Sequence, residues 1–65
     1  GEYYMKYKQM IEGNLDKASD LLESTYQGIE KSHISAQEAM KRIAQAKKHI
    51  LEVQQKISLN YDSAQ

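Results

Sequence analysis

The sequence contains no cysteine, no proline, no tryptophan and no phenylalanine, and it has only three glycines. Without cysteine, the chain cannot form a disulfide bond or a thiolate zinc site. A chain of 65 residues buries only about 60% of the surface that its unfolded form exposes. A single domain of this size therefore needs a very regular core, or a core that a second chain completes.

The chain also lacks net charge and long apolar segments. Nine Lys and Arg residues balance nine Asp and Glu residues, so no overall field attracts nucleic acid or an anionic membrane. The uninterrupted apolar runs are two to three residues long, whereas a membrane-spanning helix needs roughly 20 apolar residues and a signal-peptide core about 7–15. We therefore expect no membrane partner, and a cytoplasmic location.

Apolar residues repeat every seven positions in the second half of the chain. One series contains Ala36, Ile43, Ile50 and Ile57, and a second series, three residues later, contains Ala39, Ala46 and Val53. This spacing places both series on one side of a helix, and the period of two that a strand requires is not met. The pattern predicts a helix near residues 35–60.

The first half has the same period in a less regular form. Its two series are Leu15, Leu22 and Ile29, and Tyr4, Ile11, Ala18 and Thr25. Gly13 interrupts the pattern, and a glycine inside a helix costs up to about 1 kcal/mol relative to alanine. Because the apolar stripe passes Gly13 without a phase shift, we predict one helix near residues 3–31; a kink or a break at Gly13 is the alternative.

The polar segment between the two stripes predicts a turn near residues 32–34. Ser35 followed by Glu38 has the spacing of a helix N-terminal cap. Because so short a connection makes the helices antiparallel neighbours, the predicted fold class is all-α, a two-helix antiparallel hairpin that forms a single domain over residues 1–65. The net charges agree, since residues 1–31 hold six acids and four bases (net −2) and residues 32–65 hold three acids and five bases (net +2).

Folding about this turn pairs large residues of one helix with large residues of the other. It sets Leu22 near Ile43 and Leu15 near Ile50. We therefore expect Ile43 and Ile50 to be the most buried side chains.

Several apolar residues lie off the two main stripes and remain exposed in an isolated hairpin. They are the candidate interface residues Met10, Leu21, Met40, Ala44 and Leu51. Stacking two hairpins into a homodimeric four-helix bundle buries such residues. The alternative is another helical protein that covers the same surface. The predicted function is a protein–protein interaction module of the adapter, inhibitor or assembly-accessory type.

Catalytic and metal-binding chemistry is poorly represented. His33 and His49 are expected to lie on the order of 20 Å apart at the helical rise, and zinc usually needs three or four convergent ligands. An acidic line on the first helix is expected to face solvent; it contains Glu12, Asp16, Asp20 and Glu23. No catalytic or phosphate-binding motif occurs. We expect no enzymatic activity, no metal and no cofactor.

The alternative function is nucleic-acid binding. The candidate contacts form a basic ridge on the second helix and comprise Lys41, Arg42, Lys47 and Lys48. Positioned cations of this kind contact phosphates without reading sequence. A second candidate is the Tyr/Lys-rich segment near the N-terminus, where Tyr3, Tyr4 and Tyr7 alternate with Lys6 and Lys8, because aromatic rings among cations can stack on single-stranded bases.

Overall fold

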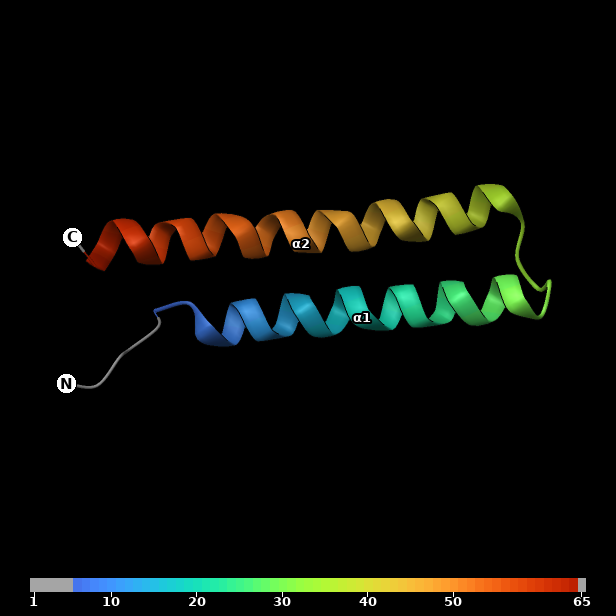
Figure 1. The fold of residues 1–65 in the computed structure, drawn as a ribbon, viewed down its shortest axis with the longest axis horizontal. Helices are drawn as coiled ribbons and strands as arrows, with labels where there is room; N and C mark the ends of the chain where they lie inside the picture. The colour runs from blue at the N-terminus through green and yellow to red at the C-terminus, as the bar shows by residue number, and fades with distance from the viewer. Residues whose placement is uncertain (1–5, 65) are drawn as a thin grey trace.

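The computed structural model describes residues 6–64, and side chains within residues 6–59. Two helices, α1 (Lys8–Glu30) and α2 (Ala36–Ala64), run antiparallel and side by side along their length (Figure 1). They form a single layer that measures 50 × 18 × 11 Å along its principal axes. The predicted all-α helical hairpin is confirmed, and residues 6–64 contain no strand.

The helix bounds differ from the predicted ones at two ends. α1 begins at Lys8, after a turn at Lys6 and Tyr7, and residues 3–5 of the predicted helix lie outside the described part of the chain. α1 continues through Gly13 without a break, as the unshifted apolar stripe predicts. α2 begins at Ala36 and runs to Ala64, beyond the predicted end near residue 60.

The end of α1 is closed by a Schellman motif, in which backbone amides that follow the helix donate to its last carbonyls. The His33 amide donates to the Gly28 carbonyl at 2.8 Å, and the Ser32 amide donates to the Ile29 carbonyl at 3.1 Å. Ser32 takes the left-handed conformation that this motif requires, with a φ of 58°. Glycine usually occupies that position, since a Cβ atom is disfavoured there.

Two contacts position the start of α2 against the end of α1. The Glu38 amide donates to Ser35 Oγ at 3.0 Å, which is the predicted N-terminal cap. Ile34 packs on Gly28, because a Cβ atom on that glycine would lie only 2.9 Å from Ile34 Cδ1. The absence of a side chain at Gly28 therefore allows the turn to fold back closely on α1.

The contact between the two helices is made mainly of small side chains. The buried residues are Ile11, Ala18, Thr25 and Gly28 on α1, and Ala39, Ala46 and Val53 on α2. Ala46 is 1% exposed and Ala18 is 3% exposed. The buried Thr25 hydroxyl donates to the Leu21 carbonyl at 2.6 Å, so it needs no partner on α2.

The prediction that Ile43 and Ile50 are the most buried side chains is wrong. Ile43 is 46% exposed and Ile50 is 38% exposed. Each lies four residues after a buried small residue, slightly more than one turn onward, and so occupies the neighbouring strip of the helix surface. A single layer of two helices has no second layer to cover that strip.

Candidate interaction surface

Among the described residues, polar contacts join the two halves of the chain on one side of the hairpin, which we call the polar face. They join Tyr7 to Lys56, Asn14 to His49, and Ser24 to Arg42. Moving seven residues forward from Tyr7, which precedes α1, to Asn14 corresponds to moving seven residues back along α2, from Lys56 to His49. The first two contacts therefore indicate which residues of the two helices lie at the same height, and the long Arg42 side chain reaches Ser24 from three residues off that register.

The central contact of the polar face is a side-chain hydrogen bond between Asn14 and His49. Asn14 Nδ2 donates to the Met10 carbonyl at 2.9 Å, which turns Asn14 Oδ1 towards His49 Nδ1 at 2.8 Å. An amide oxygen can only accept, so Nδ1 of His49 carries the proton in this contact. The pair is partly buried and links the middle of the hairpin.

Charged side chains complete the polar face on either side of this pair. Arg42 donates through Nε to Glu38 at 3.2 Å and through Nη1 to the Ser24 carbonyl at 3.4 Å. The Lys56 ammonium lies 5.4 Å from the Tyr7 ring centroid and 3.3 Å from Glu52 Oε1. Arginine and lysine stems cover apolar surface while their charged ends keep polar partners, and an open groove remains on this face beside Asn14 and His49.

The opposite side of the hairpin carries large aliphatic residues, and we call it the aliphatic face. It consists of Leu15, Leu22 and Ile29 on α1 and of Ile43, Ile50 and Ile57 on α2. These side chains are between 38% and 56% exposed. Leu15, Leu22 and Ile50 line an open groove between the helices, in agreement with the predicted pairing of Leu15 with Ile50. The aliphatic face thus places three large aliphatic residues on each helix, each about two turns from the next.

The candidate interface residues fall on both sides of the hairpin. Met10 and Leu21 belong to the polar side, because Met10 lies one turn before Asn14 and Leu21 lines a groove with Asn14 and His49. Met40 lines a groove with Ile29 near the turn. Ala44 and Leu51 directly follow Ile43 and Ile50 in the sequence, so each lies about 100° around α2 from the aliphatic face. The aliphatic face itself is the feature that the sequence analysis assigned to the core.

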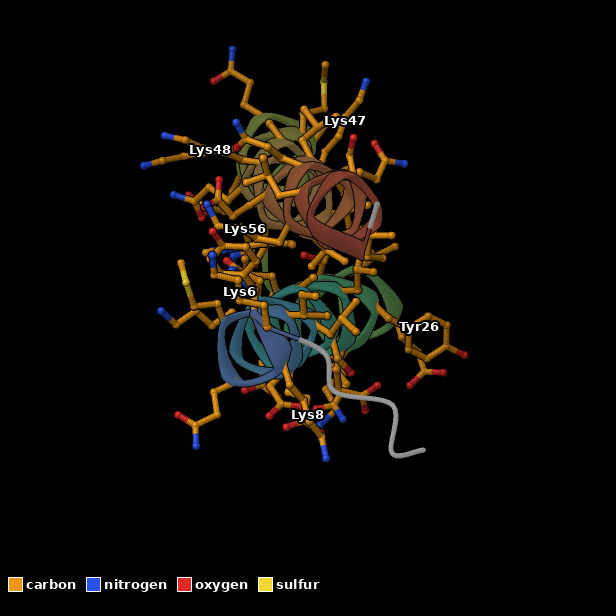
Figure 2. The ribbon with its side chains drawn as sticks, turned by 90° about the vertical axis from the view of Figure 1, so that its left-hand side faces the viewer. Lys6, Lys8, Tyr26, Lys47, Lys48 and Lys56 are labelled. Atoms are coloured by element: carbon orange, nitrogen blue, oxygen red, sulfur yellow. The ribbon has the colours of Figure 1, made fainter. Side chains whose placement is uncertain are left out.

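The candidate nucleic-acid contacts do not share one face. Lys47 and Lys48 point away from each other, and Lys48 lies on the side of Lys6 and Lys56, opposite Tyr26 (Figure 2). Arg42 is already held by Glu38 and Ser24. Lys41 is exposed on α2. Nucleic-acid binding through this set stays a prediction.

The remaining candidates also stay separate. His33 is exposed in the turn, whereas His49 lies on the polar face. The described side chains bring no three His, Asp or Glu residues together as a metal site would require. Tyr7 lies beneath Lys6 and Lys56, while Tyr3 and Tyr4 fall outside the described residues. Within residues 6–64, neither helix carries a stretch apolar enough to span a bilayer.

Comparison of the chain with protein-family models, with curated proteins and with solved structures finds no match. What the surface can bind therefore follows from its own side chains.

Proposed function

We propose that this chain is a non-catalytic helical interaction module, and that its aliphatic face docks on a second copy to form a homodimeric four-helix bundle. The observation that supports the proposal is the exposure of large apolar residues on one side. Mostly small residues, with Ile11 and Val53, lie between the two helices, while six large aliphatic residues on one side remain 38–56% exposed. A contiguous exposed apolar surface of this kind marks an interaction site.

The shape of the aliphatic face favours a copy of the same chain as its partner. The face contains three aliphatic residues from α1 and three from α2, arranged along two parallel helix axes. A second hairpin offers an apolar surface of equal length and width, and two-fold symmetry makes each contact occur twice. Full burial of a Leu or Ile side chain contributes about 1.5–3 kcal/mol, so covering the exposed part of twelve such residues is a substantial gain.

The polar face is a less favourable docking surface for a second copy than the aliphatic face. Its cross-helix contacts involve Asn14 with His49 and Arg42 with Ser24, and docking a hairpin there would bury charged groups at a cost. The two faces therefore differ in what they offer a partner. Docking through the aliphatic face leaves the charged groups of the polar face in water.

A pair of matched lysine substitutions tests the proposal. Ile43 on the aliphatic face is 46% exposed and Met10 on the polar side is 47% exposed, so each replacement changes an equally exposed residue and adds the same charge. In the proposed bundle, Ile43→Lys places two ammonium groups in the apolar centre, whereas Met10→Lys leaves its ammonium in water. The measurement is molar mass by light scattering, together with thermal unfolding at several protein concentrations.

The proposal expects the parent chain and Met10→Lys to be dimers whose melting temperature rises with concentration, because association stabilises the folded state. Ile43→Lys should lose the dimer, and lose helicity as well if the isolated hairpin is unstable. Equal dimer content in the two variants would overturn the proposal. A helical, monomeric parent chain would overturn it too and would leave the aliphatic face to a different protein.

Two further expectations belong to the same proposal. The role is that of an adapter, inhibitor or assembly accessory, since the support comes from a docking surface and no catalytic arrangement contributes to it. A cytoplasmic location is consistent with a chain that has no cysteine and so needs no oxidising compartment.

A further inference from the structure

We propose that the two copies are related by an axis parallel to the helices, so that both turns lie at the same end and α1 of each copy packs against α2 of the other. This inference rests on the proposed self-association and adds the arrangement of the copies. Two hairpins that meet through the same face have one other two-fold arrangement. In that arrangement the turns lie at opposite ends, and α1 packs against α1 of the partner.

The sequence pattern identifies which residues would meet between copies. A step of four residues turns slightly more than once around a helix, so each such step moves to the next strip in the same direction. One step leads from the small buried residues to the aliphatic face, and a second leads to what we call the outer strip. The outer strip comprises Glu12, Ser19 and Tyr26 on α1 and Met40, Lys47 and Gln54 on α2. In a four-helix bundle the aliphatic residues point to the centre, and the outer strip faces the partner's helix.

A third step of four residues gives the rim of this contact, and the rims of the two helices differ in charge. The rim of α1 is acidic throughout and consists of Asp16, Glu23 and Glu30, whereas the rim of α2 is uncharged and consists of Ala44, Leu51 and Ser58. Glu12 adds a fourth acid to the side of α1, and Lys47 is the one charge on the side of α2 among these positions. The outer strip and the rim together form one edge of each helix. The edge of α1 is acidic and the edge of α2 carries Lys47, so the two edges are complementary in charge.

This difference in charge separates the two arrangements. With the turns at opposite ends, the acidic edge of α1 meets the same edge of the partner, and like charges placed opposite each other repel. With the turns at the same end, the acidic edge of α1 meets the edge of α2 that carries Lys47. The electrostatic term favours the second arrangement.

Height along the hairpin agrees with this pairing. Asp16 lies two residues after Asn14, and Lys47 lies two residues before His49. Because Asn14 and His49 are at the same height, so are Asp16 and Lys47. When an axis parallel to the helices relates the copies, heights are preserved between them. Lys47 of one copy then lies beside Asp16 of the other.

The most exposed pair of large residues fits the same pairing. Tyr26 is 63% exposed and Met40 is 69% exposed. In the register set by Asn14 and His49, Tyr26 and Met40 differ in height by three residues, about 4.5 Å at 1.5 Å per residue, which two long side chains can span. Tyr26 projects from the side opposite Lys6, Lys48 and Lys56 (Figure 2). In the same-end arrangement Tyr26 meets the partner's Met40, a favourable sulfur–aromatic contact.

Pulsed electron paramagnetic resonance on spin-labelled chains distinguishes the arrangements. Because the chain has no cysteine, His33→Cys gives one label in the exposed turn, with the backbone amide of the Schellman motif retained. Helix axes in a bundle are about 8–10 Å apart, so turns at the same end place the labels within about 30 Å. Turns at opposite ends separate them by about 35 Å or more, since a helix of 23 residues is roughly that long at 1.5 Å per residue. Asp20→Cys, near the middle of α1, is the control and gives a short distance in either dimer.

Each outcome decides the proposal. Short distances from both labels support the same-end arrangement. A long distance for the turn label with a short one for the Asp20→Cys control overturns this inference but leaves self-association intact. No distance from either label, with a monomer mass by light scattering, overturns self-association itself and this inference with it.

A charge-reversal cycle gives a second readout. Lys47→Glu should weaken the dimer about 2- to 30-fold, because each dimer loses two exposed ion pairs worth about 0.2–1 kcal/mol each. Adding Asp16→Lys should restore most of that affinity. Independent, additive effects of the two changes would contradict the contact between Lys47 and Asp16.

Discussion

Asn14 on α1 and His49 on α2 form a 2.8 Å hydrogen bond across the hairpin, and this bond sets the height of one helix against the other. The Asn14 amide is oriented by the Met10 carbonyl, so its oxygen is already directed at the histidine. The bond lies on the polar face, opposite the large aliphatic residues. Because the bond holds one side of each helix against the other helix, it also helps to keep the large aliphatic residues on the opposite side.

The first prediction concerns the strength of this bond. Asn14→Ala alone is a poor test, because alanine also raises helix propensity and offsets part of the loss. A double-mutant cycle with Asn14→Ala and His49→Ala removes that effect, and we expect a coupling free energy of about 0.5–1.5 kcal/mol. The measurement is urea unfolding at one fixed protein concentration. Additive single effects would show that the two side chains do not interact in solution.

The second prediction uses two glycines that lie in the same helix but in different surroundings. Gly13 has nothing within 4 Å of a Cβ atom built on it, whereas at Gly28 that atom would lie 2.9 Å from Ile34 Cδ1 and 3.0 Å from Ile34 Cγ1 and Cγ2. Gly13→Ala should stabilise the fold by about 0.5–1 kcal/mol through helix propensity. Gly28→Ala should destabilise it by about 1–3 kcal/mol, because Ile34 must move.

Thermal unfolding of the two alanine variants under the same conditions is the check. Gly28→Ala in an Ile34→Ala background should lose its penalty, since the clashing side chain is gone. Stabilisation of similar size by both glycine replacements in the parent chain would mean that Ile34 does not pack on Gly28.

The third prediction concerns the left-handed residue of the turn. Ser32 has a φ of 58°, where a side chain costs roughly 1–2 kcal/mol. Ser32→Gly removes that cost but makes the unfolded chain more flexible, so we expect a net stabilisation of about 0.5–1 kcal/mol. That corresponds to a rise of a few degrees in the melting temperature. A lower melting temperature would contradict the left-handed turn.

The fourth prediction concerns the cap at the start of α2. Ser35 Oγ accepts a hydrogen bond from the Glu38 amide at 3.0 Å, so Ser35→Ala should cost about 0.5–2 kcal/mol. Ser35→Asp is the matched control, because a carboxylate can accept the same bond at a helix N-terminus. If calorimetry finds all three chains equally stable, Ser35 does not cap the helix.

Sequence reasoning recovered the hairpin, its antiparallel pairing and the Ser35 cap because each depends on local spacing. It did not recover which apolar series lies between the helices. A seven-residue repeat contains two adjacent apolar strips, and spacing alone does not say which strip faces the neighbouring helix. The small series lies there, as Ala18 and Ala46 show, because small side chains let two helices approach closely. The larger Ile43 and Ile50 are displaced to one side.

The candidate surface was predictable in part for the same reason. Met40 adjoins the aliphatic face and Ala44 and Leu51 lie one strip further out, but Met10 and Leu21 lie on the other side. Asn14 and His49 occupy the strip on the other side of the small residues. Once the small residues are placed between the helices, the sequence spacing also predicts that Asn14 and His49 lie on the same side of the hairpin. The packing of Ile34 on Gly28 had no comparable signal, because it depends on the path of the turn.

Sedimentation equilibrium of the unmodified chain, from micromolar to millimolar concentration, tests most directly whether the aliphatic face is covered by a second copy. The protomer mass is 7.5 kDa, and we predict a concentration-dependent approach to twice that mass, about 15 kDa, in a cooperatively folded, helical state. A helical chain that remains at 7.5 kDa over the whole range would contradict self-association.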